Sequence, residues 1–279
     1  MQVQACSLNL NVLVQSTRLN QHIRIQLIIM KLTILGSGTA IVTARRGSSG
    51  YLIKIADKTL LLDSGSGTLK KIAEASSSFK EVDYAIYSHL HPDHVTDLIS
   101  LLFALRIPSN YKSKDLTVFG PVGMKEFHRN LSATFDDFIE PRGYELTINE
   151  LSRGHLDFEN FRLTSSLINH HAGSLAYRVE SKEGKTIVYS GDTDYCESIV
   201  ELARDVDVLL LECSYPKHIK VDGHLNSTLA GRIARESNCR KLILTHFYPI
   251  CDDYDILGEC REEFSEEIVL AEDLMTIEV

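Results

Sequence analysis

The sequence of 279 residues predicts an α/β protein in which two packed β-sheets carry helices on their outer faces. Three observations lead to this prediction. Short apolar runs typical of strands alternate with helical stretches, and blocks of strands surround helices in both halves of the chain. The composition, 44% apolar and 24% charged, is that of a soluble globular chain with a substantial core. The length suits one large α/β domain or two small ones.

The strands are predicted from alternating or continuous apolar runs that end at Gly, Pro or Asp. In chain order they cover 31–37, two strands within 49–67 joined near Asp57 and Lys58, 82–88, 115–121, 144–151, 161–169, 175–181, 186–192, 207–213 and, as the last core strand, 241–247. Helical spacing predicts helices over 67–76, 95–107, 122–135 and 226–237. The second of these helices stops before Pro108, because the residue before a proline avoids helical dihedrals.

The folded domain is predicted to cover 30–279, starting at Met30 in "MKLTILGSG". Residues 1–29 are rich in Gln and Asn and differ in character from the rest of the chain, so we interpret them as a non-native or disordered leader. The apolar run at 27–30 is too short for a signal-peptide core. No run of about 18 apolar residues is present, which excludes a transmembrane helix of ordinary length.

The six cysteines are scattered and show no C-x-x-C spacing, which argues against a zinc knuckle or a disulfide framework. We interpret them as reduced thiols in a cytoplasmic protein. The formal charge of −9 disfavours nonspecific attraction to polyanions without excluding a local basic patch.

Four predicted core strands end in a residue that can bind a metal, namely His89, His170, Asp192 and His246. The end of a central strand is a rigid position from which to direct a side chain. The run "VDYAIYS" at 82–88 would therefore be the mount for the histidines that come directly after it.

The segment "HLHPDH" combines three histidines and one aspartate in six positions. Alternate residues point the same way, so His89 and His91 can reach one ion. After a turn near Pro92, Asp93 and His94 can reach a second. Neutral imidazoles and carboxylates suit zinc. Two ions about 3.5–4 Å apart can hold a phosphoryl or acyl group between them.

From Met30 to its end the chain resembles the metallo-β-lactamase superfamily, whose signature is H-x-H-x-D-H. The order of the other motifs also fits: an early "LGSG", then "LLLDSGSG", the signature, a lone histidine, "SGDT" and a late "THF". Among the branches of the superfamily it is most similar to the ribonuclease Z-type phosphodiesterases. The resemblance implies an αββα sandwich of two mixed sheets with helices on both outer faces, and homodimers are common in similar proteins.

The resemblance also implies two bound Zn²⁺ ions, with Mn²⁺ or Fe as possible replacements. The implied ligands are His89, His91 and His170 for the first ion, Asp93, His94 and His246 for the second, and Asp192 as a bridge between them. His170 is preferred to its neighbour His171 because the family has this ligand seven residues before the tyrosine of the next strand, Tyr177 here. His171 would then be a hydrogen-bond donor beside the site.

The same resemblance implies further site residues. Glu212 and His224 would together protonate the leaving group, although Leu211 stands where the branch has the histidine of H-E-A-T. Asp63 in "DSGSG" would lie near the metal site and help to orient the ligands, although a plain turn explains this segment nearly as well. Independently of the resemblance, Arg45 and Arg46 follow the turn "LGSGTA" and could meet a substrate phosphate, although a solvated pair explains them equally well.

The expected function is a dinuclear metal-dependent phosphodiesterase in which a hydroxide between the metals attacks phosphorus and Asp93 orients that hydroxide. The substrate would be a small or cyclic phosphodiester or an RNA 3′ end. Ribonuclease Z enzymes carry a tRNA-binding arm between the lone histidine and the bridging aspartate. Here His170 and Asp192 stand 22 positions apart, which leaves no room for it.

Several alternatives remain open. The same metal core can hydrolyse lactones or thioesters, and a tRNA 3′-processing endoribonuclease is a further possibility. A flavo-diiron redox protein would have a glutamate where this chain has His91. A non-catalytic metal-binding module would be expected to lose ligands, whereas every ligand position is filled here.

Overall fold

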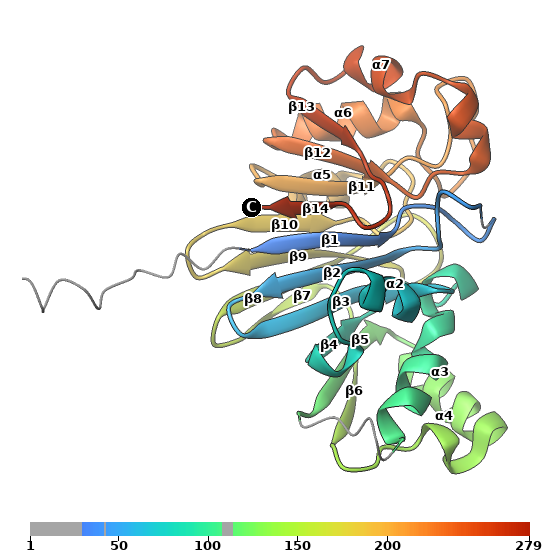
Figure 1. The fold of residues 1–279 in the computed structure, drawn as a ribbon. Coiled ribbons are helices and arrows are strands. Elements are labelled where there is room, and N and C mark those ends of the chain that lie inside the picture. The colour runs from blue at the N-terminus through green and yellow to red at the C-terminus, as the bar shows by residue number, and fades with distance from the viewer. Residues whose placement is uncertain (1–29, 42, 108–113) are drawn as a thin grey trace, which may run out of the picture.

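The computed structural model describes residues 30–41, 43–107 and 114–279, and in it two seven-stranded sheets lie face to face (Figure 1). The first sheet has the order β14-β1-β2-β3-β4-β5-β6, and the second has the order β13-β12-β11-β10-β9-β8-β7. Both sheets are mixed, because β3 to β6 and β10 to β13 pair in parallel whereas the remaining neighbours pair antiparallel. The predicted αββα sandwich is confirmed.

The strands of the first sheet are β1 (Lys31–Gly36), β2 (Gly50–Ile55), β3 (Lys58–Ser64), β4 (Tyr84–Ile86), β5 (Leu116–Pro121), β6 (Leu146–Leu151) and β14 (Thr276–Glu278). Those of the second are β7 (Gly154–Asp157), β8 (Phe161–Leu167), β9 (Leu175–Ser181), β10 (Thr186–Tyr189), β11 (Val208–Glu212), β12 (Lys241–Thr245) and β13 (Glu267–Leu270). The central strands β3, β11 and β12 are buried along nearly their whole length, which explains why they appear in the sequence as continuous apolar runs.

The helices lie on the two outer faces of the sandwich (Figure 1). They are α2 (Thr68–Glu74), α3 (Pro92–Arg106), α4 (Met124–Phe135), α5 (Glu197–Leu202), α6 (Ser227–Ser237) and α7 (Ile256–Arg261), with short 3₁₀ turns η1 (Phe79–Glu81), η3 (Asp136–Ile139) and η4 (Pro249–Asp253). Side chains of α2, α3 and α4 pack on the first sheet, and those of α5, α6 and α7 pack on the second.

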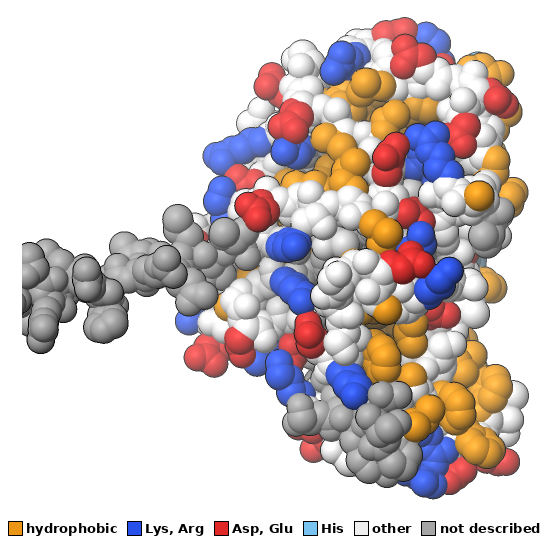
Figure 2. Space-filling view, in the orientation of Figure 1, with side chains coloured by type: hydrophobic (Ala, Val, Ile, Leu, Met, Phe, Trp, Pro, Cys, Tyr) orange, Lys and Arg blue, Asp and Glu red, His pale blue; other side chains and the backbone are white. Residues whose placement is uncertain are grey.

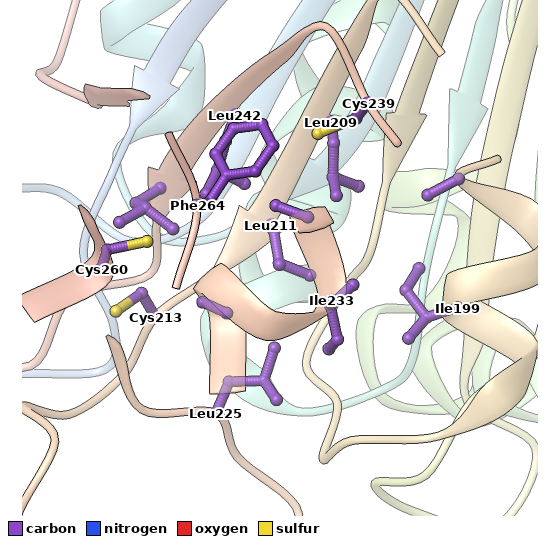
Figure 3. Close-up of a cluster of buried hydrophobic side chains, with 14 of the residues drawn as sticks. Ile199, Leu209, Leu211, Cys213, Leu225, Ile233, Cys239, Leu242, Cys260 and Phe264 are labelled. Atoms are coloured by element: carbon purple, nitrogen blue, oxygen red, sulfur yellow. The ribbon is translucent and has the colours of Figure 1, made fainter. Parts of the chain in front are cut away.

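Three clusters of buried side chains hold these layers together. One lies between the two sheets and includes Tyr51 and Ile243. The other two lie under the helices on either side, and Figure 3 shows the one under α6, where Leu211 of β11 packs near Ile233 of the helix. Each cluster contains 16 or more buried residues, which is enough apolar surface to fix the strand ends from which the loops emerge.

The sequence patterns missed several elements. The helix expected from residue 95 begins at Pro92, because a proline at the first helical position fits the helix without needing its missing N–H. The strand at 241–247 is not the last, since β13 pairs with β12 and β14 returns to pair with β1. The short β7 and the six-residue helices α5 and α7 were not expected either, because they are too short to show a clear periodicity.

Other expectations concern the whole chain. The proposed leader, residues 1–29, lies outside the described residues, so that interpretation stays a prediction. The five described cysteines are free thiols, as expected. Within the described ranges no helix is both long and apolar enough to cross a membrane.

Candidate metal centre

The seven residues that the sequence singled out as metal ligands meet at one edge of the sandwich. His89 and His91 lie on the loop after β4, Asp93 and His94 in the first turn of α3, and His170, Asp192 and His246 shortly after β8, β10 and β12. The parallel strands of each sheet end at this edge, and the carboxyl ends of such strands are where α/β proteins commonly bind ligands. Residues 89–94 therefore come from the first sheet, and the other three come from the second.

The first group of side chains consists of His89, His91, His170 and Asp192, whose nearest ligand atoms all lie within 4.8 Å of one another. Nε2 of His170 is 3.1 Å from Nδ1 of His91. Oδ2 of Asp192 is 3.7 Å from Nε2 of His89 and 3.8 Å from Nε2 of His170. These separations suit side chains that surround a single cation.

The second group consists of Asp93, His94 and His246, again with ligand atoms within 4.8 Å of one another. Oδ1 of Asp192 is 3.3 Å from Nε2 of both His94 and His246. Nε2 of His246 is also 3.5 Å from Oδ2 of Asp93. The two oxygens of Asp192 therefore face different groups, which is the arrangement of a carboxylate that can bridge two cations.

The backbone near the centre is tightly constrained. Gly191 precedes Asp192 with φ of 60°, and a Cβ there would come within 2.7 Å of Cβ of Ser88. Asp63 and His246 also adopt left-handed φ angles, 53° and 59°, which costs a non-glycine residue about 1–3 kcal/mol. Such conformations persist only where surrounding contacts hold them, and here they direct two site residues inward.

Hydrogen bonds behind the centre orient the histidines of the first sheet. Nδ1 of His94 lies 2.7 Å from Oδ2 of Asp63, and Nδ1 of His89 lies 3.0 Å from Oγ of Ser88. Ser88 in turn donates to Asp63 at 2.6 Å, and the Tyr189 hydroxyl donates to the same carboxylate at 2.5 Å. Because Asp63 and Ser88 act as acceptors, Nδ1 of each histidine carries a proton, and Nε2 is the ring atom that faces the centre.

The second sheet repeats this pattern with different residues. Nδ1 of His246 lies 3.0 Å from Oγ of Ser214, which donates to Oε2 of Glu212 at 2.6 Å. Nδ1 of His170 lies 2.9 Å from the carbonyl oxygen of Gly223. A serine and a buried carboxylate therefore stand behind one histidine in each layer, and they fix the same tautomer in both.

Four of the atoms that face the centre have no hydrogen-bond partner of their own. Nε2 of His89, His94 and His246 and Oδ1 of Asp192 are buried and make no hydrogen bond. Buried polar atoms normally have partners, and a set of lone pairs that face one another is unfavourable unless a cation lies between them. Imidazole and carboxylate donors in this number suit zinc and similar divalent cations, so the residues present fit a metal centre.

The surroundings set the charge of these groups. Burial lowers the pKa of His89 well below its ordinary value, and it also lowers the pKa values of His91 and His170. Burial acts on Asp192 and His94 in the direction that disfavours charge. Nevertheless, nearby histidines hold the pKa of Asp192 well below its usual range, and Asp192 with Asp63 raises that of His94. His89, His91 and His170 are therefore neutral and ready to bind at neutral pH, whereas a cation would displace a proton from His94.

Glu212 and His224 form a separate pair beside the centre. Nδ1 of His224 is 3.1 Å from Oε1 of Glu212, which is 1% exposed and also accepts the backbone N–H of Thr193 at 2.7 Å. Burial lowers the pKa of His224, but the hydrogen bond to Glu212 and the negative charges of Glu212, Asp192 and Asp93 together outweigh burial, and the net shift is upward. One ring nitrogen of His224 lies within 4.8 Å of ligand atoms of Asp192 and His246, close enough to serve a group bound there.

Two residues expected near a substrate or ligand behave differently. His171 is exposed and its ring lies 5.8 Å from the ring of His91, outside the groups that share ligand atoms. Arg46 points into the protein interior rather than to the surface. Its guanidinium is buried, donates to Oγ of Ser37 and to the carbonyl of Ala271, and lies over the ring of Phe247. The sequence pattern could not show that the loop folds this arginine inward.

Sequence reasoning missed the residues that support the ligands, in particular Ser88 and Ser214. Both are fully buried, and each stands next to or near a predicted residue, in "YSH" and "ECS". A serine that ends a buried apolar strand beside a histidine was the available signal, because a buried hydroxyl needs partners.

Comparisons with known proteins agree with this geometry. The model of the β-lactamase superfamily domain matches residues 58–247. Ribonuclease Z of Archaeoglobus fulgidus is 25% identical over 308 residues, covering 90% of this chain and 98% of that protein. The crystal structure of the metallo-β-lactamase fold protein YhfI from Bacillus subtilis has a TM-score of 0.76 and 28% identity, covering 90% of this chain and 100% of YhfI. Human tRNase Z, short form, shares the fold with a TM-score of 0.73 and 23% identity, covering 89% and 98% of the two chains.

Proposed function

The chain belongs to the β-lactamase superfamily, and we propose that it is a metal-dependent phosphodiesterase. The observation that carries the proposal is the Glu212–His224 pair at the edge of the metal-ligand cluster. A phosphodiester expels a poor alkoxide leaving group, which departs more easily when it receives a proton. A buried carboxylate that holds an imidazole in one tautomer supplies such a donor.

We assign the seven clustered residues as ligands of two divalent cations, which we propose to be Zn²⁺, with Mn²⁺ or Fe as possible replacements. His89, His91 and His170 would hold the first, Asp93, His94 and His246 the second, and Asp192 both. When bound, such ions lower the pKa of water toward neutrality and offset charge on phosphoryl oxygens.

The residues of the chain have distinct roles in this proposal. Asp93 would orient the attacking water, because its carboxylate lies beside His246 and stays ionised at neutral pH. His224 would donate a proton from its ring to the leaving oxygen, while Glu212 holds that ring. Asp63 would act only through His94 and Ser88.

A small or cyclic phosphodiester is the substrate class that we favour. β9 and β10 form a hairpin that fills the stretch between His170 and Asp192, and the net charge is −9. The alignment with the archaeal ribonuclease Z runs over 308 residues yet uses 90% of this chain, so that enzyme carries segments that this chain lacks. An RNA 3′ end is the second candidate, supported by the similarity to ribonuclease Z.

The test is hydrolysis of bis-p-nitrophenyl phosphate by purified protein of known metal content, followed by a panel of pre-tRNA, cyclic nucleotides, cyclic ribose phosphates, lactones and thioesters. We expect zinc to co-purify, phosphodiesters to turn over, and Asp192→Ala to lose both metal and activity. Turnover of lactones or thioesters alone would replace the proposed substrate class. Metal without any turnover would favour a binding module.

Location and assembly belong to the proposal as well. The five described free thiols support a reducing compartment, and therefore a cytoplasmic location.

The homodimer stays a prediction. Exposed hydrophobic side chains of α3 and η3, including Phe103 and Phe138, lie close together. Hydrophobic side chains also gather at the lower right of Figure 2, in the region of α3 and α4. Sedimentation of wild type and of a Phe138→Ser variant would test whether this face joins two copies.

A further inference from the structure

The segment 215–226, which comes after β11, supplies two groups to the site. The carbonyl of Gly223 accepts the hydrogen bond from His170, and the next residue is His224, the proposed proton donor. The segment has no regular secondary structure apart from an isolated bridge between its ends, Tyr215 and Asn226. Something else must therefore hold these two groups in place.

Lys220 and Asp194 provide that support. Nζ of Lys220 donates to Oδ2 of Asp194 at 2.6 Å and also to the carbonyl oxygens of Val221 and His224, at 2.7 and 3.2 Å. The same oxygen of Asp194 accepts the backbone N–H of Gly223 at 3.2 Å. The pair thus binds three backbone groups around His224: the carbonyl oxygens of Val221 and His224 and the N–H of Gly223.

Asp194 is itself fixed to the metal-ligand loops. It lies two residues after Asp192, and its N–H donates to the carbonyl of Asn169, directly before His170, at 2.6 Å. Its other carboxylate oxygen accepts the N–H of Tyr195 at 2.8 Å. One residue therefore joins the loops that carry His170 and Asp192 to the segment that carries His224.

There is little room for a side chain at Gly223. Its φ is 82°, and a Cβ there would lie 3.1 Å from Nδ1 of His170. The Lys220 side chain is 41% exposed, and an exposed ion pair by itself contributes little to stability. The main effect of this pair would thus be on the position of the backbone at residues 221–224 rather than on the stability of the fold.

We propose that Asp194 and Lys220 form a positioning pair, which sets the place of His224 for proton transfer and of the Gly223 carbonyl behind His170. The part that concerns His224 rests on the proposed phosphodiesterase activity. The part that concerns His170 does not, because it predicts an effect on metal binding alone. Neither residue contacts the reacting atoms in this proposal.

The test compares Lys220→Met with Lys217→Met. Lys217 lies on the same segment and forms an ion pair of similar length, 2.7 Å, with Glu262, but its side chain has no bond to residues 221–224. Two readouts are measured on each protein: the zinc dissociation constant by competition with a chromophoric chelator, and kcat on phenyl and p-nitrophenyl phosphodiesters. The Lys220→Met change is also made in a His224→Ala background.

We expect Lys220→Met to weaken zinc binding and to slow the phenyl ester by about tenfold to a hundredfold, the range seen when groups that orient ligands are removed. The p-nitrophenyl ester, which needs less proton donation, should be slowed less. Lys217→Met should match wild type, and in the His224→Ala background Lys220→Met should cause little further loss of rate on the phenyl ester.

The outcomes separate the two proposals. If wild type turns over no phosphodiester, the proposed function fails, and the zinc measurement still decides the role of the pair at His170. If Lys220→Met equals Lys217→Met in both zinc affinity and phenyl-ester turnover, the positioning role is overturned. An equal loss of rate with and without His224, measured at saturating zinc, would overturn the part that concerns His224, because the pair would then not act through that residue.

Discussion

Nδ1 of His94 donates a hydrogen bond of 2.7 Å to Oδ2 of Asp63, and both side chains are 0% exposed. Asp63 also accepts the backbone N–H of Ser88 at 2.7 Å, and the hydroxyls of Ser88 and Tyr189 donate to it as well. The contact links a left-handed residue near the end of β3 to the first turn of α3. It shows how a residue outside the cluster can determine where the His94 ring points.

Replacement of Asp63 by Asn tests this relationship. The amide group would present N–H donors to the donors of Ser88 and Tyr189, and it would also remove the negative charge that holds the proton on Nδ1 of His94. We expect the affinity for zinc to fall by about tenfold to a hundredfold. Competition against a chelator of known affinity measures the change.

Asp83→Asn is the matched control for that variant. Asp83 is 8% exposed, and its carboxylate accepts the N–H of Thr59 at 2.9 Å, at the opposite end of β3 from the ligand loops. The Asp83→Asn variant should lose roughly 1–3 kcal/mol of stability, which is typical of a disturbed buried hydrogen bond, and keep its zinc affinity. Equal zinc affinity in the Asp63 and Asp83 variants would contradict the role given to Asp63.

Removal of metal should lower the thermal stability of the protein without unfolding it. The ligands join two sheets that already share a buried core, so the apoprotein keeps its packing. Free zinc at a hundred times its dissociation constant would raise the free energy of unfolding by about 2.7 kcal/mol. Calorimetry before and after dialysis against a chelator, and again after zinc is restored, measures the shift. An unchanged melting temperature would argue against the metal centre.

His224→Ala should retain its metal and lose rate. General acids contribute about 10²–10⁴-fold, so the loss should be largest on esters with poor leaving groups. Metal analysis of the purified variant, together with kcat on phenyl and p-nitrophenyl esters, measures both effects. A variant that turned over the phenyl ester at the wild-type rate would show that the proton comes from elsewhere.

Four buried thiols should stay inert over the pH range in which the protein is studied. Burial raises the pKa of Cys239, Cys251 and Cys260 to about 12 and that of Cys213 well above its ordinary value. At pH 8 the thiolate fraction of the first three is then about one part in ten thousand, and thiolate is the reactive form. It increases only as the pH rises toward 12.

Titration with Ellman's reagent measures the reactivity of these thiols. A variant with Cys6→Ser and Cys196→Ser should show no fast reaction at pH 8 when native and four thiols after denaturation. Wild type serves as the comparison for the remaining two thiols. Fast labelling of the native double variant would mean that one of the four sites opens readily.

The sequence predicted well which histidines and aspartates meet at this edge, because each one stands at the end of a buried strand or in one short signature. His89, Asp192 and His246 all come after apolar runs whose burial the structure confirms, so their convergence results from strands that end at one edge. The resemblance to a known superfamily provided the order of the motifs and the choice of His170 over His171.

Other features depended on contacts that no local pattern records. Arg46 turns inward because Ser37 and Ala271, distant from each other in sequence, offer acceptors. The link from Asp194 to Lys220 crosses 26 positions and joins two irregular segments. The last strand, β14, pairs with the first one described, β1, and its three residues are too few to show alternation.

The hydroxyl of Tyr51 on β2 meets Oγ1 of Thr245 on β12 at 2.9 Å, in the buried layer next to His246. Since the proposed ligands are divided between the two sheets, any slip of one sheet over the other would change the spacing of the cations that they would hold. Metal affinity would thus depend on how the two sheets are positioned relative to each other. A substitution that creates a cavity in the core between the sheets, away from the proposed ligands, should therefore lower the affinity for metal.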